Sequence, residues 1–320
     1  MFVNQEPEER ENRLLAATGA PDATRVITEA DDQTTMPGDN RSFWQRARDM
    51  IRQRPLGAVG FFIVCGYIIL ALFGPLLAPY SPTLPALSQR LMAPSAAHLF
   101  GTDSVGMDVF SRILYGARID LFSSVVVVLI SGSLGTVVGM AAAWAGGWWD
   151  ETLMRITDMF LAFPGLILAM AIAAILSPSL TNALIAIAVT YWPVYARIGR
   201  SQALAVKQRE YIEAARVVGS RSTKILFRHI MPNSIAPVVV QATLDTGAVI
   251  LLTAGLSFIG FGAQPPTPEW GAMISAGQQY IMSQWWISVA PAIAILLLVM
   301  GFNLFGDGLR DEMDPRMRDS

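Results

Sequence analysis

The sequence contains little cysteine, histidine or charge. Its single cysteine, Cys65, excludes an intramolecular disulfide. Two histidines, His98 and His229, are too few for a His/Cys metal site, and the sequence has no Gly-x-x-x-x-Gly-Lys-Ser/Thr phosphate-binding loop. Charged residues make up 15% of the chain, against about 25% in soluble globular proteins, and no Lys/Arg-rich face indicates nucleic acid. We therefore expect no metal, no cofactor, no nucleotide site and no nucleic-acid partner.

Hydrophobic residues, at 53%, instead occur in long uncharged intervals. A membrane-spanning helix needs about 20 apolar residues. The longest interval, 38 residues between Asp158 and Arg197, can hold two helices and is divided by Ser177-Pro178-Ser179. We predict an all-α, polytopic membrane protein with six transmembrane helices, near residues 57–79, 121–147, 159–177, 180–198, 237–260 and 286–306.

The distribution of Lys and Arg predicts the orientation. With a cytoplasmic N-terminus, the inside segments from residue 41 onward carry 17 basic residues and the outside segments carry 3. This bias places both termini in the cytoplasm. Residues 1–40 hold nine acidic residues against three arginines and have no apolar signal region, so we expect a disordered acidic tail.

The predicted cytoplasmic segment 197–236 carries eight basic residues and also an apolar pattern. A narrow apolar stripe recurs there at helical spacing: Tyr211, Ala214, Ala215 and Val218. Gly219 suits the end of that helix, and a second apolar helix follows before Pro232. Two interpretations stay open: the helices pack only on this chain's own membrane helices, or their apolar face binds a cytosolic partner.

The other long aqueous segment, 80–120, lies on the predicted outside. It begins with prolines, and from Asp108 its apolar residues recur at helical spacing, which predicts an interfacial helix leading into the second span. We favour a packed cap without a ligand contact. Tryptophans at both predicted interfaces are typical of aromatic belts: Trp144, Trp148 and Trp149 on one side, Trp270, Trp285 and Trp286 on the other.

Asp245 interrupts the fifth predicted span, roughly 12 Å deep at 1.5 Å per residue. An ionisable group near the bilayer centre costs about 2.5–3.5 kcal/mol, so it should face the bundle or a wet pathway. Asp245 is a pathway candidate that contacts the cationic amine of a solute; the alternative is a pair with a partner subunit or with backbone N–H groups. In the second span, Gly135 and Gly139 favour close helix packing.

Several segments resemble the permeases of ATP-driven importers that receive solute from a binding protein. The run from Glu213-Ala214-Ala215 to Gly219, followed by His229-Ile-Met-Pro232, is similar to their cytoplasmic EAA loop. More narrowly, an ordered set of motifs over residues 43–318 resembles the C-type permease subunit of dipeptide/oligopeptide/nickel importers. The set comprises Gly101-Thr102-Asp103, Asp108 to Arg112, Gly116-Ala-Arg118, Phe163-Pro164-Gly165, 255–271 and 302–315. Met107 departs from it, because the family usually has Arg at this position.

The resemblance implies a type I ABC importer permease fold in the bacterial plasma (inner) membrane. The implied organisation is a cytoplasmic tail (1–42), a region with the first transmembrane helix and an external loop (43–116), the permease domain (117–306) and a C-terminal tail (307–320). The implied ATPase-coupling residues are Glu213, Ala214, Ala215, Gly219, His229 and Pro232. Asp103, Asp108 and Arg112 are implied to belong to the external loop. The implied partners are a second, non-identical permease, cytoplasmic ATPase subunits, an extracytoplasmic solute-binding protein and the lipid bilayer.

The expected function is thus that of a transport subunit, not an enzyme, with ATP hydrolysis left to partner subunits. Short peptides are the favoured solutes, while nickel chelates, glutathione and opine-like compounds stay open. The alternative is a stand-alone secondary transporter or channel, which typically shows inverted repeats and several buried ionisable residues. An intramembrane enzyme would need a Ser/His or paired-Asp arrangement within the spans, and the sequence shows neither.

Overall fold

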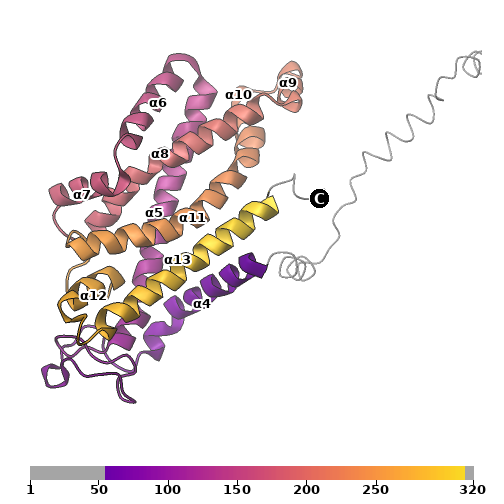
Figure 1. The fold of residues 1–320 in the computed structure, drawn as a ribbon. Coiled ribbons are helices and arrows are strands. Elements are labelled where there is room, and N and C mark those ends of the chain that lie inside the picture. The colour runs from indigo at the N-terminus through magenta and orange to yellow at the C-terminus, as the bar shows by residue number, and fades with distance from the viewer. Residues whose placement is uncertain (1–54, 314–320) are drawn as a thin grey trace, which may run out of the picture. The chain divides into compact units, whose positions relative to one another are not determined.

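The computed structural model describes residues 55–313, so the predicted tail of residues 1–42 lies outside the described residues. This part of the chain is helical, with no named strand (Figure 1). The helices are α4 (Pro55–Leu77), α5 (Val109–Ala145), α6 (Gly147–Leu161), α7 (Gly165–Leu176), α8 (Leu180–Lys207), α9 (Glu210–Val217), α10 (Ser222–Ile225), α11 (Met231–Ile259), α12 (Trp270–Gly277) and α13 (Trp286–Met313). A π-helical turn, Leu226–Ile230, joins α10 to α11 without a break.

Four helical segments in residues 55–313 are long and apolar enough to cross a membrane: α4, α5, Leu226–Ile259 and α13. They confirm the spans predicted near 57–79, 121–147, 237–260 and 286–306. The interfacial helix predicted from Asp108 is the first part of α5, which runs for 37 residues, roughly 55 Å. By length and composition, the described residues provide four spans, or five with one bent pair, so the predicted six is not reached.

The span predicted near 159–177 is not one continuous helix. This segment is divided between α6 and α7, which meet at a bend of 88°. Pro164 lies at the break, before the first residue of α7. Proline has no N–H to donate to a preceding carbonyl, and its ring disfavours a helical residue before it, so the α6 helix ends there.

The helix predicted at 180–198 starts at Leu180 and continues to Lys207. The Ser179 hydroxyl accepts a hydrogen bond from the Asn182 N–H at 3.1 Å, which caps this helix. Although α8 is 28 residues long, it is not among the helices apolar enough to count as spans. Arginines in its second half bind α6: Arg200 contacts both Asp150 oxygens at 2.6 and 2.7 Å, and Arg197 contacts Asp158 at 2.6 Å.

Glycines allow the closest helix contacts. A Cβ on Gly135 or Gly139 of α5 would clash with the α8 backbone at Trp192 or Ala196, which confirms the predicted packing role of this pair. Similarly, a Cβ on Gly60 of α4 would clash with the backbone of α13. Helix α13 lies between α4 and α11 (Figure 1), and its apolar side chains join one core with both of them.

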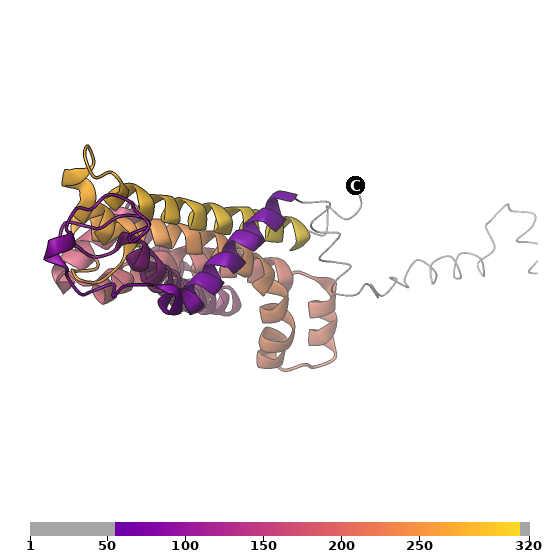
Figure 2. The same cartoon turned by 90° about the horizontal axis from the view of Figure 1, so that it is seen from below.

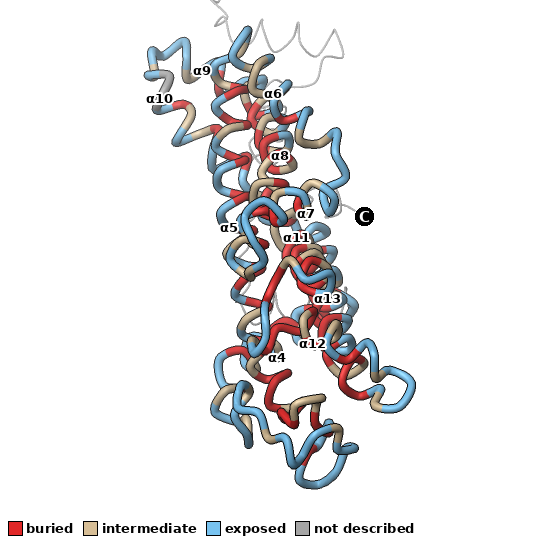
Figure 3. Tube along the Cα trace, turned by 90° about the vertical axis from the view of Figure 1, so that its left-hand side faces the viewer, coloured by how far each residue is buried: buried red, intermediate tan, exposed pale blue. Residues whose placement is uncertain are grey.

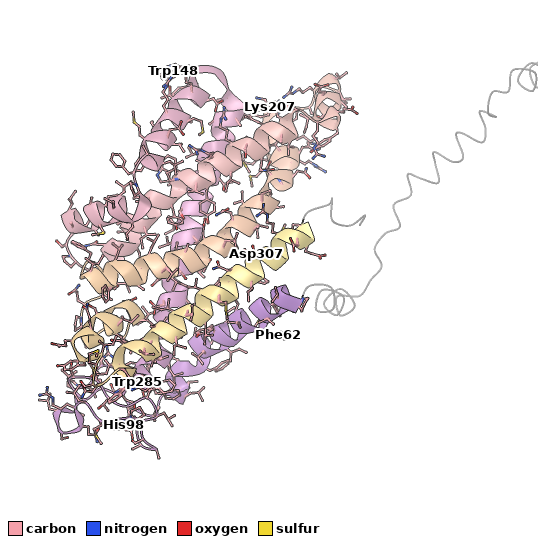
Figure 4. The ribbon with its side chains drawn as sticks, viewed as in Figure 1. Phe62, His98, Trp148, Lys207, Trp285 and Asp307 are labelled. Carbon is pink, nitrogen blue, oxygen red and sulfur yellow. The ribbon has the colours of Figure 1, made fainter. Side chains whose placement is uncertain are left out.

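The described helices place two different structures at opposite ends of the bundle. Helices α9 and α10 lie at one end and project from it, whereas α12 and the loop between α4 and α5 lie at the other (Figures 1 and 2). Trp148 and Lys207 mark the first end, and His98 and Trp285 mark the second (Figure 4). Buried residues are concentrated along the bundle between them (Figure 3).

The aromatic-belt prediction was wrong for two tryptophans. Trp148, Trp149 and Trp285 are exposed, as expected for an interface. Trp270 and Trp286 are buried instead, and their indole N–H groups donate to the carbonyls of Ile113 and Thr102, at 3.2 and 3.3 Å. Because a buried indole N–H needs an acceptor, Trp270 joins α12 to α5, Trp286 joins α13 to the α4–α5 loop, and neither faces lipid.

Candidate coupling site

Helix α9 is a short helix with a well-defined end. Glu210 and Glu213 lie in its first turn, where the helix dipole favours negative charge. At the other end the Ser220 N–H donates to the Ala215 carbonyl at 3.0 Å, and the Gly219 N–H donates to the Arg216 carbonyl at 2.9 Å. This is the Schellman arrangement, and Gly219 adopts the left-handed conformation that it requires, with φ +80. Gly219 therefore ends α9, as predicted.

One side chain fastens α9 to the rest of the chain. Ile212 has 0% exposure and packs with Ile225 and Ile230 of the following helical segments. The same cluster includes residues from the ends of α5 and α8, namely Met140, Ala143, Ala203 and Val206. The motion of α9 is thereby tied to α5, α8 and the start of α11.

The opposite face of α9 is apolar and exposed. Tyr211, Ala214 and Val218 of the predicted stripe are exposed, and Val217 and Val218 are 88% and 85% exposed. Only Ala215 of the stripe is half-buried. The sequence pattern therefore identified a largely exposed face of α9, and it missed Ile212. The Ile212/Ala215 pair, spaced i and i+3, is the signal that would have found the buried side.

The remaining predicted coupling residues lie around this helix. The His229 ring is 6.3 Å from the Tyr211 ring, and the His229 carbonyl accepts a hydrogen bond from Asn233 at 2.6 Å. Pro232 does not end the second helix of the loop, as the sequence had suggested. It occupies the first turn of α11, where a missing N–H costs nothing, so the loop continues directly into a membrane helix.

Glu213 is exposed and forms no ion pair among the described residues. Its carboxylate is available to a group outside this chain. Glu210, one turn of the same helix earlier, is exposed as well, which makes it a natural comparison for any effect of Glu213.

Asp245 lies between α8 and α11, away from the coupling helix. It is 7% exposed, and its Oδ1 accepts a hydrogen bond from Gln241 at 2.9 Å. The Tyr195 side chain of α8 is its neighbour, but Asp245 Oδ2 and Tyr195 Oη are buried without a partner at full hydrogen-bonding geometry. The carboxyl group thus faces the interior of this chain, between the two helices that flank the coupling loop.

The three predicted external-loop residues make internal contacts in two groups, Asp108 with His98 and Ser111, and Asp103 with Arg112. Asp108 caps α5 by accepting from the Ser111 N–H at 2.7 Å, and it contacts His98 Nδ1 at 2.9 Å. Asp103 Oδ1 accepts the N–H groups of Val105 and Met107 at 3.0 and 2.9 Å. These bonds shape the loop itself.

Arg112 connects this loop to the segment before α12. Its guanidinium donates to the Pro82 carbonyl at 2.8 Å and to the Pro266 carbonyl at 3.2 Å, and Nε lies 3.8 Å from Asp103. Arg112 Nη1 also lies 3.0 Å from the sulfur of Met107, which is buried. The unusual methionine is therefore part of the packed network.

Two family models match this chain. Residues 135–319 match the model of the "binding-protein-dependent transport system inner membrane component" family, and residues 42–94 match the "N-terminal TM domain of oligopeptide transport permease C". An inward-facing structure of the MetNI methionine ABC transporter aligns with 61% of this chain and 95% of its own, at 20% identity and a TM-score of 0.48.

Curated relatives cover most of the chain. The dipeptide transport system permease protein DppC of Alkalihalophilus pseudofirmus is 47% identical over 86% of this chain and 90% of its own. The probable D,D-dipeptide transport system permease protein DdpC of Escherichia coli K12 is 46% identical over 83% and 90%. The glutathione transport system permease protein GsiD of Escherichia coli O6:K15:H31 is 42% identical over 90% and 93%. The chain thus belongs to the family of binding-protein-dependent transport system inner membrane components, multi-pass proteins of the bacterial inner membrane.

Proposed function

We propose that this chain forms half of the translocation pore of an ATP-driven importer, and that α9 couples it to an ATPase subunit. The observation that carries the proposal is the two-sided character of α9: Ile212 is buried in the chain's own core, while Val217 and Val218 are almost fully exposed. Burying such apolar side chains against a partner is worth about 1.5–3 kcal/mol each. Membership of a binding-protein-dependent transport family supports ATPase and binding-protein partners.

The proposed mechanism is a rigid-body movement. Helix α8 leads into the coupling loop, and the loop leads through the π-helical turn into α11 without interruption. A displacement of α9 by a closing ATPase pair is therefore transmitted to two long helices at once, because Ile212 and the turn resist independent movement. The second pore half would come from a non-identical permease, and both termini would lie on the ATPase side, in the cytoplasm.

Short peptides are the proposed solutes. The similar permeases named above belong to dipeptide, D,D-dipeptide and glutathione transport systems, whose named solutes are all short peptides or peptide-like. The expected result is that one of these compounds raises the melting temperature of the binding protein associated with this chain. Stabilisation only by a nickel chelate or an opine would contradict the peptide assignment.

The coupling role of Glu213 is tested with a charge reversal in the assembled importer. We expect Glu213→Lys to abolish at least nine-tenths of ATP-dependent uptake while membrane insertion stays normal, because the contact lies outside this chain's own core. Glu210→Lys is the matched control, since it removes a similar charge–dipole interaction of about 0.3–1 kcal/mol in the same turn. Equal losses in both variants would reduce Glu213 to a helix-stabilising residue.

A further inference from the structure

Two carboxyl side chains meet in the interior of the bundle, where the segment before α12 passes α5. Asp120 on α5 is 4% exposed, and Glu269, directly before α12, is 0% exposed. The two carboxyl groups lie within hydrogen-bonding reach of each other. Two ionised carboxylates in contact and out of water would repel each other without hydration to offset the repulsion. The contact therefore requires a proton.

The other bonds of the pair show where the proton lies. Glu269 Oε1 accepts the Gly271 N–H at 2.9 Å, and Oε2 accepts the Ala272 N–H at 2.7 Å, so this carboxylate caps α12. Asp120 Oδ2 accepts one N–H, that of Trp270, at 3.2 Å. Hydrogen bonds from N–H groups and the start of a helix both favour an ionised carboxylate. Asp120 is thus the carboxyl that donates and Glu269 the one that accepts.

No cation neutralises the pair among residues 55–313. The elements packed around the pair carry the following titratable or charged groups: Cys65 and Tyr67 on α4, Tyr80, Arg90, His98, Asp103 and Asp108 in the α4–α5 loop, Arg112, Tyr115 and Arg118 on α5, and Tyr280 after α12. The Arg112 guanidinium is engaged by backbone carbonyls, and none of these groups stabilises the charge of Asp120 or Glu269. Helix α12 and α13 as far as Gly306 carry no titratable side chain. Helix α11 contributes the Ser257 hydroxyl, while its one titratable side chain, Asp245, is directed at Gln241 and Tyr195.

We propose that Asp120 and Glu269 form a proton-binding site, in which one shared proton links α5 to the start of α12. This inference goes beyond the transport function and does not depend on it. Burial raises the pKa of Glu269 above that of a solvated carboxyl group.

The site makes stability depend on pH in a defined direction. Above about pH 4 the unfolded chain has released the protons of both carboxyl groups, whereas the folded chain retains one. Stability therefore falls as pH rises, by up to about tenfold in the unfolding equilibrium per pH unit, until the pair itself loses its proton. Above that pH the two carboxylates repel each other, and the link between α5 and α12 is lost.

Infrared spectroscopy on the purified importer complex tests the proton directly, because a protonated carboxyl has a carbonyl stretch that an ionised carboxylate lacks. At neutral pH we expect Asp120→Asn to lose one such band relative to the wild type, and Glu269→Gln to retain the band at a shifted frequency, because the hydrogen-bond acceptor of Asp120 changes. Asp103→Asn is the matched control: it removes a carboxylate beside Arg112, and all protonated bands should remain. Since this readout involves no transport, its outcome is independent of the proposed coupling role.

An unchanged protonated-carboxyl spectrum in Asp120→Asn and Glu269→Gln would overturn the proposal. If neither single variant assembles, the D120N/E269Q double variant preserves a hydrogen bond between uncharged amides and should assemble. That complex should lack the band and should also lose the fall in melting temperature between neutral and alkaline pH. Retention of either the band or the wild-type fall in the double variant would equally refute a shared proton at this site.

Discussion

At the scale of single residues, the coupling helix depends on one buried side chain and one backbone conformation. Ile212 gives α9 its attachment to the core, and Gly219 lets the chain turn back directly after the helix. Nothing lies within 4 Å of a Cβ added to Gly219, so the constraint there is the left-handed backbone and not space. Amino acids differ in how well they tolerate a left-handed backbone, so two substitutions at position 219 can be compared.

Replacing Gly219 by asparagine or by valine tests whether the left-handed backbone at this position is required. Asparagine visits the left-handed region readily, whereas a residue with a branched Cβ is strained there by about 1–2 kcal/mol or more. We expect Gly219→Asn to retain most of the ATP-dependent uptake and Gly219→Val to lose most of it, at equal levels in the membrane. Uptake assays in vesicles measure both, and equal activity of the two variants would show that the turn is not required.

Asp245 gives a second prediction at this scale. Because its carboxyl is buried against Gln241 and Tyr195, we expect Asp245→Asn to change the uptake of neutral and cationic solutes by the same factor. Competition assays with matched neutral and cationic peptides measure this ratio. A selective loss for cationic solutes would instead support the solute contact that remains the alternative for this residue.

At the scale of helices, glycines allow the membrane helices to pack closely against one another. Helix α5 approaches α8 at Gly135 and Gly139 so closely that a Cβ would meet the α8 backbone. Paired charges between α6 and α8 then hold the bent α6–α7 segment against the same helix. Because α8 and α11 enclose the coupling loop, the α5–α8 contact also determines how α9 is held.

Gly139→Ala tests this contact. Even one methyl group at this position would clash with the carbonyl of Ala196, and overpacking typically costs 1–3 kcal/mol. We expect a several-fold loss of folded protein, measured by fluorescence-detected size-exclusion chromatography. Gly66→Ala on α4 is the control, since nothing lies within 4 Å of a Cβ there, and it should fold normally. Equal yields of the two variants would contradict the close contact.

At the scale of the whole molecule, the described bundle presents different chemistry at its two ends. One end carries α9 with its exposed apolar face. The other carries a tightly hydrogen-bonded loop in which Asp103, Asp108 and Arg112 are used for internal contacts. In the proposed importer, the first end would receive motion from an ATPase and the second would present a rigid surface to a binding protein.

In the proposed importer the ATPase subunits supply the energy for transport, and this gives a prediction for the intact chain. Reconstituted alone in liposomes, with or without an ion gradient, the chain should accumulate no solute above its external concentration. Added with its partner permease, ATPase subunits and binding protein, it should show uptake that requires ATP. Concentrative uptake by the chain alone would instead support the secondary-transporter alternative.

Much of the local structure followed from the sequence. Long uncharged intervals located α4, α5, α11 and α13, and the position of Gly219 indicated the end of α9. The failures came where a local signal has two outcomes. Pro164 lies at the break between α6 and α7, whereas Pro232 lies in the first turn of α11 and does not end a helix. Trp270 was predicted to lie at the membrane interface, but its side chain is buried and its indole N–H donates to the Ile113 carbonyl.

The sequence by itself determined that this is a membrane protein, that it is helical and where α9 ends, because hydropathy and helix-end signals are local properties. Only the tertiary structure decided which face of α9 is free, that Asp103 lies beside Arg112 while Asp108 pairs with His98, and that Asp120 meets Glu269. These outcomes depend on contacts between residues up to about 150 positions apart, since a buried charge is tolerable only beside the partner that the fold supplies.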